Sequence, residues 1–438
     1  MRFHVMTAHA PLEGVVRVPG DKSISHRAVL FAALAQGTSQ LSGVLDSADV
    51  RSTIAAVSAL GARVELSAQP DGSLAGSITG WGERGPVTPA APVDCGNSGT
   101  TVRLLMGVLA GWPGLAVTLT GDESLSRRPM RRVTEPLSAM GAVFEDTDGH
   151  VPVTVTGADL APVAYATPVP SAQVKTAVLL AGLRAPGRTT VSESAPSRDH
   201  TERMLPAFDV AVGRDERALS AWVDGPVVPR AADVAVPADP SSAAFLACAA
   251  AIVPGSRVTL SDLALNPTRT GFLEVLKRMG VPVEFTTASG QFAEESADVT
   301  VSFAPDLSAT LVEAHEVPSL IDEIPVLAVV AARAAGTTRF EGVGELRVKE
   351  SDRLEAVRAG LAAVGVAVRV DGDALEVDGP AELRGAALDS LGDHRLAMAW
   401  AIAGLVLEPG QVLEIDRFDA VEVSYPGFAH DLESVGAR

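Results

Sequence analysis

The sequence of 438 residues is poor in cysteine, in aromatic residues and in positive charge. Its two cysteines, Cys95 and Cys248, exclude a disulfide framework, and no histidine stands at the spacing of a zinc site. Lys and Arg number 35 against 54 Asp and Glu, a net charge of −19. This charge argues against nucleic acid or an anionic membrane as the main partner.

Long apolar runs are also absent. The longest, residues 396–407, is shorter than the about 20 residues that span a bilayer, and the N-terminus lacks the apolar region of a signal peptide. The phosphate-loop, dinucleotide, zinc-protease and hydrolase motifs do not occur either. We therefore expect a cytoplasmic protein with no cofactor, no metal, no nucleic acid and no membrane partner.

What the chain does contain is a sixfold repeat. Hydrophobic residues make up 47% of the sequence but aromatic residues only 4%, so Ala, Val and Leu must form the cores. Six runs of these residues follow a small polar residue and end at a glycine. The polar starts are Asp21, Asn97, Ser171, Asp239, Asp322 and Asp393, and the glycines are Gly37, Gly114, Gly187, Gly255, Gly336 and Gly410.

Each repeat predicts a buried helix and a strand. The polar start can cap the helix, a run that is apolar on all sides is a buried helix, and the glycine permits a left-handed turn. An alternating strand and then an amphipathic helix follow in most repeats. Three repeats in each of two domains match the length, with a boundary near residues 227–238. Ordinary alternation of helices and strands could mimic such a repeat.

Cationic and polar side chains gather at or near these helix starts, which attract anions through free N–H groups and the helix dipole. The set includes Lys22, Ser23, Arg27, Asn97, Gly99, Arg103, Arg128, Ser171, Gln173, Lys175, Arg198, Lys349, Arg353, His394 and Arg395. In an acidic protein this pattern predicts an anion site between the domains, for a ligand with several phosphates or carboxylates. Each residue alone could equally be a cap or a surface charge, and Asp322 could be a helix cap or a catalytic base.

At these positions the sequence resembles the 5-enolpyruvylshikimate-3-phosphate synthase (3-phosphoshikimate 1-carboxyvinyltransferase) family of enolpyruvyl transferases. The matching segments occur in order along nearly the whole chain. They are PGDKSISHR (19–27), GNSGTTVR (96–103), RP (128–129), SAQVK (171–175), SRDHTE (197–202), IDE (321–323), VKESDR (348–353) and DHR (393–395).

The resemblance implies a two-domain inverted α/β fold, with three βαβαββ units around buried parallel helices in each domain. Residues 20–233 would form the N-terminal domain on the shikimate 3-phosphate side. Residues 1–19 and 234–438 would form the C-terminal domain on the phosphoenolpyruvate side, with the active site in the interdomain cleft. The family also leads us to expect a monomer.

The implied reaction transfers the enolpyruvyl group of phosphoenolpyruvate to the 5-hydroxyl of shikimate 3-phosphate and releases phosphate, in chorismate and aromatic amino acid biosynthesis. Asp322 would accept a proton, Glu350 would protonate the methylene carbon, and Lys22 would also be catalytic. The implied substrate-binding residues are Lys22, Ser23, Arg27, Gly99, Arg128, Ser171, Ala172, Gln173, Ser197, Arg198, Asp322, Lys349, Arg353 and Arg395.

Three positions depart from patterns found in the family. Val423 stands where some members have Lys, Glu345 where some have Asn, and Ala172 replaces a second Ser. Gly99 is retained where some glyphosate-insensitive members have Ala, so we expect glyphosate to compete with phosphoenolpyruvate.

Two alternatives stay open from the sequence. One is the related enolpyruvyl transferase that acts on UDP-N-acetylglucosamine, which uses a cysteine-bearing loop and a Lys-Asn opening where this chain has Lys22-Ser23. The other is a non-catalytic anion-binding protein of the same fold.

Overall fold

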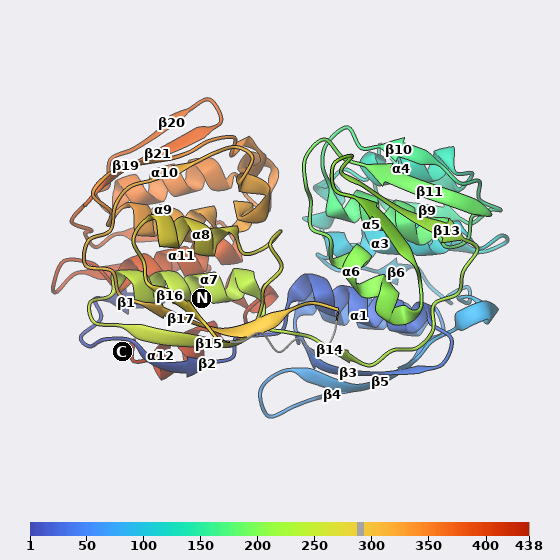
Figure 1. The fold of residues 1–438 in the computed structure, drawn as a ribbon, viewed down its shortest axis with the longest axis horizontal. Helices are drawn as coiled ribbons and strands as arrows, with labels where there is room; N and C mark the ends of the chain where they lie inside the picture. The colour runs from blue at the N-terminus through green and yellow to red at the C-terminus, as the bar shows by residue number, and fades with distance from the viewer. Residues whose placement is uncertain (287–292, 438) are drawn as a thin grey trace. The chain divides into compact units, whose positions relative to one another are not determined.

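The computed structural model describes residues 1–286 and 293–437, and the chain divides into two compact units. Unit 1 comprises the described residues of Met1–Pro19, Pro237–Gly290 and Glu295–Arg438, and unit 2 those of Gly20–Val236 and Gln291–Glu294. Residues 234–236, which the sequence assigned to the C-terminal domain, lie in unit 2 because strand β14 (Val234–Ala235) pairs with β3 (Thr38–Val44). Figure 1 shows the elements of both units.

Unit 2 contains three four-stranded sheets. The first has the order β14-β3-β5-β4, with β5 (Leu74–Thr79) and β4 (Arg63–Ala68). The second is β6-β7-β9-β8 (Val93–Asp94, Ala116–Thr120, His150–Thr156, Val143–Thr147), and the third is β10-β11-β13-β12 (Ala164–Ala166, Gly187–Ser192, Ser220–Gly225, Val212–Asp215).

Unit 1 repeats this pattern. Its sheets are β2-β15-β17-β16 (Glu13–Val16, Arg257–Ala264, Ser296–Ser302, Val283–Phe285), β18-β19-β21-β20 (Leu311–Val312, Gly336–Phe340, Ala374–Gly379, Val368–Asp371) and β22-β23-β1 (Ala387–Asp389, Val412–Asp416, Phe3–Met6). In every sheet described, the first pair of strands is parallel and the second pair antiparallel.

Two strands are exchanged relative to the chain order. Strand β2 precedes the first buried helix, of unit 2, yet it pairs with β15 in unit 1, and β14 precedes α7 of unit 1 yet pairs with β3 in unit 2. The last repeat lacks the hairpin that completes the others. The N-terminal strand β1 takes the antiparallel place beside β23 instead.

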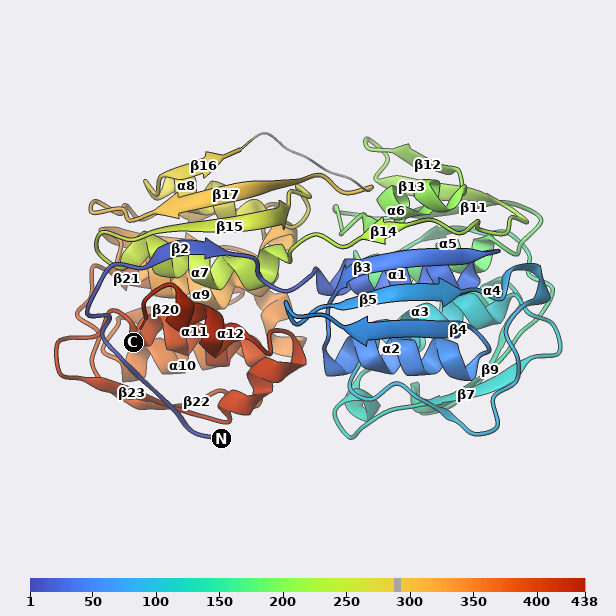
Figure 2. The same cartoon turned by 90° about the horizontal axis from the view of Figure 1, so that it is seen from below.

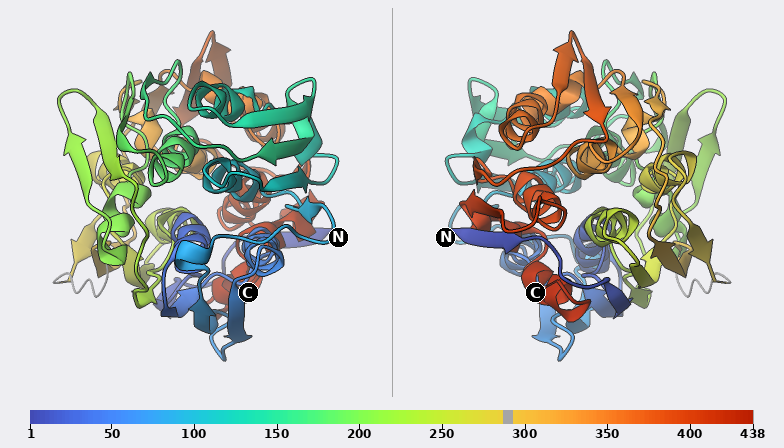
Figure 3. Two further views of the ribbon diagram at one scale, coloured as in Figure 1. Left: turned by 90° about the vertical axis from the view of Figure 1, so that its right-hand side faces the viewer. Right: turned by 90° about the vertical axis from the view of Figure 1, so that its left-hand side faces the viewer.

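The buried helices of each unit lie inside its sheets, as the views of Figure 3 show. The buried helices are α1 (Lys22–Leu34), α3 (Gly99–Ala110) and α5 (Ala172–Gly182) in unit 2, and α7 (Pro240–Ile252), α9 (Ile324–Ala331) and α11 (His394–Gly404) in unit 1. The other α-helices are α2 (Ala48–Ala59), α4 (Arg131–Ala139), α6 (His200–Met204), α8 (Gly271–Arg278), α10 (Arg353–Ala363) and α12 (Phe428–Ser434). Figure 2 shows β2, β15 and β17 lying along α7.

Short polar side chains start five of the six buried helices, as the repeat predicts. The side chains of Asp21, Ser171, Asp239 and Asp393 each accept a hydrogen bond from a first-turn N–H group. Ser98 caps α3, one residue after the predicted start. Asp322 is different: it lies in the 3₁₀ turn η5 (Ile321–Glu323) before α9 and caps nothing. The capping interpretation of Asp322 is therefore wrong.

Glycine closes each buried helix because the backbone turns left-handed there. All six predicted glycines have a positive φ, between 77° and 128°, which costs other residues energy. The third repeat has no glycine after its second helix, and the structure explains the exception. Asp209 takes the left-handed conformation there, at φ 61°, which Asp tolerates better than most side chains.

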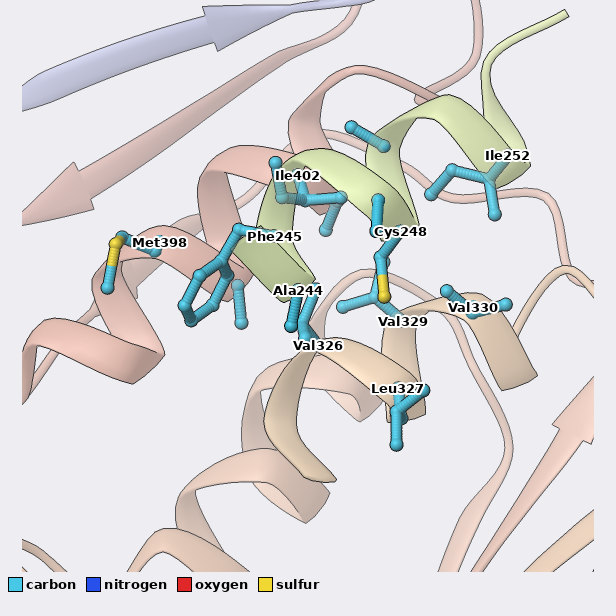
Figure 4. Packing of buried hydrophobic residues seen from close by; sticks show 14 of the residues in the cluster. Ala244, Phe245, Cys248, Ile252, Val326, Leu327, Val329, Val330, Met398 and Ile402 are labelled. Atoms are coloured by element: carbon cyan, nitrogen blue, oxygen red, sulfur yellow. The ribbon is translucent and has the colours of Figure 1, made fainter. Parts of the chain in front are cut away.

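Ala, Val, Leu and Ile dominate both cores, as the composition requires. In unit 1, Phe245 and Cys248 of α7 pack among Val326 and Leu327 of α9 and Ile402 of α11 (Figure 4). Unit 2 has a separate core around α1, α3 and α5. No helix in the described ranges combines the length and apolarity needed to cross a membrane.

Candidate active site

In unit 2, Arg27 of α1 lies where the starts of α1, α5 and α6 meet. Its Nε donates to Thr201 Oγ1 at 2.8 Å and its Nη2 to Thr176 Oγ1 at 3.0 Å. Its Nη1 donates to the Ser23 carbonyl at 3.1 Å. Thr176 and Thr201 are themselves 2.6 Å apart, so neutral oxygens hold the guanidinium in one orientation.

Arg27 is a buried cation, 3% exposed. No carboxylate of the described residues forms an ion pair with it. Burial lowers its pKa to about 10, although Glu202 and Asp21 act in the opposite direction. A guanidinium in this state gains most from a ligand that brings negative charge.

Ser171 and Ser197 are tied together by one carboxylate. Glu193 accepts the backbone N–H of Ser171 at 2.8 Å and the hydroxyl of Ser197 at 2.7 Å. Ala172 begins α5 directly after Ser171, so its N–H is among those with no acceptor within the helix. Arg198 follows Ser197 and is close enough to Arg27 to lower its pKa.

Two arginines lie over Gly99, at the start of α3. A Cβ placed on Gly99 would be 2.9 Å from Arg103 Nη1 and 3.3 Å from Arg128 Nη1. Arg103 also donates to Gln173 Oε1 at 2.7 Å, and Arg128 donates to Asn97 Oδ1 at 2.8 Å. The structure thus joins three predicted residues, Gly99, Arg128 and Gln173, in one group of donors.

Lys22, the first residue of α1, has a carboxylate partner. Its Nζ lies 2.5 Å from Asp49 Oδ2 of α2. The Lys22 side chain is 26% exposed, so its ammonium still reaches the surface of the unit. Asp49 holds this ammonium at the helix start.

In unit 1 the predicted residues gather around Arg353, the first residue of α10. Its Nε donates to Asp393 Oδ2 at 2.7 Å, its Nη1 to Asp322 Oδ1 at 3.1 Å and its Nη2 to Glu350 Oε2 at 2.6 Å. Arg353 is 1% exposed. Burial disfavours its charged form, but Glu350, Asp393 and Asp322 together raise its pKa.

Asp322 lies among three cations. Arg353 is joined by Lys349, whose Nζ is 3.7 Å from Asp322 Oδ1, and by Arg395, whose Nη2 is 3.7 Å from Oδ2. Arg395 also approaches Glu323, at 3.4 Å. The η5 turn is what frees the Asp322 carboxylate from the helix backbone and places it here. Glu350 is more open, with 37% of its side chain exposed.

Asp49 and Glu193, two carboxylates that organise these clusters, were not identified from the sequence. Arg103 and Lys175 were identified only as cations near helix starts, and Asp393 only as a helix start. Asp393 caps α11 and also accepts a hydrogen bond from Arg353. Burial acts to raise the pKa of the Asp393 carboxyl, but Arg353 lowers it by more, so the pKa lies below its ordinary value. Its place at a helix start and in the DHR segment gave no indication of its bond to Arg353. Glu193 and Asp49 stand outside the matched segments, so only the fold reveals them.

The two cysteines are not reactive thiols. Cys95 and Cys248 are fully buried. Burial raises the pKa of the Cys95 thiol to about 12, with help from Asp94, and raises that of Cys248 further. Neither thiol can act as a reactive thiolate or an exposed acid near neutral pH.

Two of the positions that depart from the family pattern can be located in the structure. Val423 ends the 3₁₀ turn η7 (Phe418–Val423), and Glu345 is exposed.

Comparison with known proteins identifies the family of this chain. The family model of EPSP synthase (3-phosphoshikimate 1-carboxyvinyltransferase) matches residues 6–432. The chain belongs to this family. A 3-phosphoshikimate 1-carboxyvinyltransferase of Rhodospirillum rubrum is 48% identical over 444 residues, covering 100% of this chain and 97% of the relative. That of Bacillus subtilis is 43% identical, covering 98% of each.

Solved structures show the same two-unit α/β fold. An EPSP synthase from Acinetobacter baumannii has a TM-score of 0.90 and 36% identity, covering 100% of this chain and 98% of that one. The enolpyruvyl transferase NikO from Streptomyces tendae shares the fold, with a TM-score of 0.77 at 19% identity over 99% of this chain and 97% of its own. The predicted fold class is therefore confirmed, and so is the family resemblance.

Proposed function

We propose that this chain transfers the enolpyruvyl group of phosphoenolpyruvate to the 5-hydroxyl of shikimate 3-phosphate, releasing phosphate, in aromatic biosynthesis. Family membership supports the reaction, and the contrast between the two clusters supports a different role for each unit. In unit 2 neutral oxygens hold the buried Arg27, and no carboxylate of the described residues forms an ion pair with it. Unit 1 offers carboxylates held beside Lys and Arg.

Shikimate 3-phosphate would bind to unit 2. Ser171, the N–H of Ala172, Ser197 and Arg198 suit its phosphate, because a helix start and a guanidinium both favour an anion. Arg27 and Ser23 would contact the shikimate part. Its carboxylate would supply the counter-charge that Arg27 lacks, and Gln173 adds a neutral donor from α5.

Phosphoenolpyruvate would take cations from both units. Lys22, Gly99, Arg128 and Gln173 are the candidates in unit 2, and Arg353 and Arg395 those in unit 1. Bringing two polyanions together costs about 4 kcal/mol per close charge pair at an effective dielectric of 20. Several guanidinium and ammonium groups are therefore needed to offset the repulsion.

The carboxylates would move the protons. Asp322 accepts the proton of the 5-hydroxyl while the hydroxyl oxygen bonds to C2 of phosphoenolpyruvate. Glu350 donates a proton to the methylene carbon. The addition product then loses a proton from that carbon and expels phosphate from C2. Lys349, beside Asp322, would contact the shikimate hydroxyls, and Lys22 would stabilise the phosphate as it leaves.

The proposal requires that the two clusters act on the same substrates. We therefore propose an active site between residues 20–233 and the domain formed by 1–19 and 234–438, which would close over the substrates and exclude water. We further propose that the chain works as a cytoplasmic monomer.

The test is phosphate release from phosphoenolpyruvate, with shikimate 3-phosphate or UDP-N-acetylglucosamine as acceptor. We expect turnover with shikimate 3-phosphate alone. Lys22→Ala should reduce it at least about 1,000-fold with a nearly unchanged unfolding temperature, because Lys22 lies outside the core. Turnover with the nucleotide sugar, or calorimetric binding without any turnover, would refute the proposal.

A further inference from the structure

A buried ion cluster in unit 2 has no role in the reaction as described so far. Lys175 of α5 lies 2.8 Å from Glu193 and 2.8 Å from Glu202 of α6. All three side chains are buried, with 7% of the Lys175 side chain and 3% of each glutamate side chain exposed. Burying three charges is costly and rarely increases stability over apolar packing, so a function for the cluster is worth seeking.

The cluster contacts two residues of the proposed phosphate site, Ser171 and Ser197. Glu193 follows β11 and holds the Ser171 N–H and the Ser197 hydroxyl, which belong to two separate loops. Glu202 follows Thr201, the residue that orients Arg27. One ammonium thus fixes the two carboxylates that in turn position the helix start of α5 and the loop before α6.

The charge of Lys175 matters as much as its position. Glu193 and Glu202 would both repel a phosphate dianion if nothing balanced them. Lys175 neutralises one of the two charges, and Arg27 is close enough to interact with Glu202. Burial acts to lower the pKa of Lys175, but the two glutamates raise it, so the ammonium stays charged.

We propose that Lys175 is a positioning residue for the phosphate of shikimate 3-phosphate: it holds Glu193, and through it Ser171 and Ser197, and it balances one of the two carboxylate charges near the proposed phosphate site. This inference rests on the proposed function. It predicts a larger effect on shikimate 3-phosphate than on phosphoenolpyruvate, because among the described residues no hydrogen bond or ion pair joins the proposed phosphoenolpyruvate contacts Gly99 and Arg128 to the cluster.

Lys175→Met keeps the length of the side chain and removes its charge. We expect the KM for shikimate 3-phosphate to rise at least about 20-fold and the KM for phosphoenolpyruvate to change less than about threefold. The double variant Lys175→Met/Glu193→Gln restores the charge balance and should recover most of the affinity. A merely structural lysine would not be rescued in this way. Lys277→Met, which removes the ammonium from an exposed pair with Glu274 on α8, is the matched control.

Glu193→Asp provides a second test should Lys175→Met fail to fold. It keeps the charge but shortens the reach, so the carboxylate can no longer hold both Ser171 and Ser197, and the KM for shikimate 3-phosphate should rise at least about fivefold. Wild-type turnover with unchanged KM values in Glu193→Asp, or in a folded Lys175→Met, would overturn the inference and leave the proposed function intact. Absence of wild-type turnover would overturn both.

Discussion

The two units treat a buried arginine at a helix start in opposite ways. Arg27 in unit 2 and Arg353 in unit 1 are 3% and 1% exposed. Arg27 is held by two threonine hydroxyls and a carbonyl, and burial lowers its pKa to about 10. Arg353 binds three carboxylates, which raise its pKa despite burial.

This difference in partners indicates a different role for each arginine. A buried cation with neutral partners has paid part of its desolvation cost without a counter-ion, so an anionic ligand stabilises it strongly. A buried cation with three carboxylates is already compensated. Arg353 holds Asp322, Glu350 and Asp393 in place, and two of these carboxylates are the acid–base groups of the proposed reaction.

The largest expected effect comes from breaking the compensated site. Arg353→Met would leave Asp393 and Asp322 buried without their main partner, so the free energy of unfolding should fall by about 3–5 kcal/mol and activity should be lost. Urea unfolding measures the change. Arg369→Met is the matched control, since Arg369 binds Glu376 and Asp378 at the surface, and it should cost less than about 1 kcal/mol. Equal losses in the two variants would show that Arg353 is not specially compensated.

Arg27→Met should give the opposite pattern. Because Thr176 and Thr201 still bond to each other, the free energy of unfolding should change by less than about 1 kcal/mol. The KM for shikimate 3-phosphate should rise at least about 100-fold, since hydrogen bonds to a charged group contribute about 1.5–3 kcal/mol each. A loss of stability as large as that of Arg353→Met would contradict the comparison.

Unit 2 should also respond to mild acid, through the buried His26. Burial lowers the pKa of His26 to about 3, assisted by Lys22 and Arg27 and opposed by Asp49. Below pH 6.5, His26 is therefore protonated in the unfolded chain but stays neutral in the folded chain. Stability that is fully present above pH 6.5 is lost as the pH falls toward 3, by up to about 1.4 kcal/mol per pH unit.

Urea unfolding at pH 6.5 and pH 5 tests this effect. The wild type should lose about 1.6 kcal/mol more than His26→Gln, whose amide can still bond to Thr53 as His26 does. His4→Gln is the control, because more than half of the His4 side chain is exposed. Identical acid sensitivity of His26→Gln and the wild type would rule out His26 as the cause.

The smallest effect concerns the guanidinium groups over Gly99. In Gly99→Ala the new methyl group must displace Arg103 or Arg128, so the KM for phosphoenolpyruvate should rise about tenfold, equivalent to about 1.4 kcal/mol. Inhibition by glyphosate should weaken at least as much. Gly427→Ala, where a Cβ meets nothing closer than 3.7 Å, is the control. A wild type whose turnover is unaffected by millimolar glyphosate would contradict the expected competition.

Local sequence rules predict much of the fold but few of the contacts between side chains in the candidate site. Caps such as Asp21 and Asp393 and the closing glycines could be predicted because each acts within a few residues of itself. The partners of Arg27 could not, since Thr176 and Thr201 lie 149 and 174 positions away in the sequence. Nor could the sequence distinguish Asp393, which caps a helix, from Asp322, which does not, because the η5 turn depends on tertiary packing.

The family motifs supplied residue types at the site but not their partners. Arg353 was identified from VKESDR, yet its bond to Asp393 joins two segments 40 residues apart. Lys175 stands within SAQVK, but the pattern gives no indication that it binds Glu193 and Glu202. Such contacts follow only from the packing of α5 against β11 and α6.

Calorimetric titration of shikimate 3-phosphate, without phosphoenolpyruvate, tests the contrast between the units most directly. We predict that Arg27→Met weakens binding at least about 100-fold, and that Arg395→Met, in the carboxylate cluster of unit 1, changes it less than about threefold. Undiminished binding by Arg27→Met, with loss of binding in Arg395→Met, would contradict this prediction.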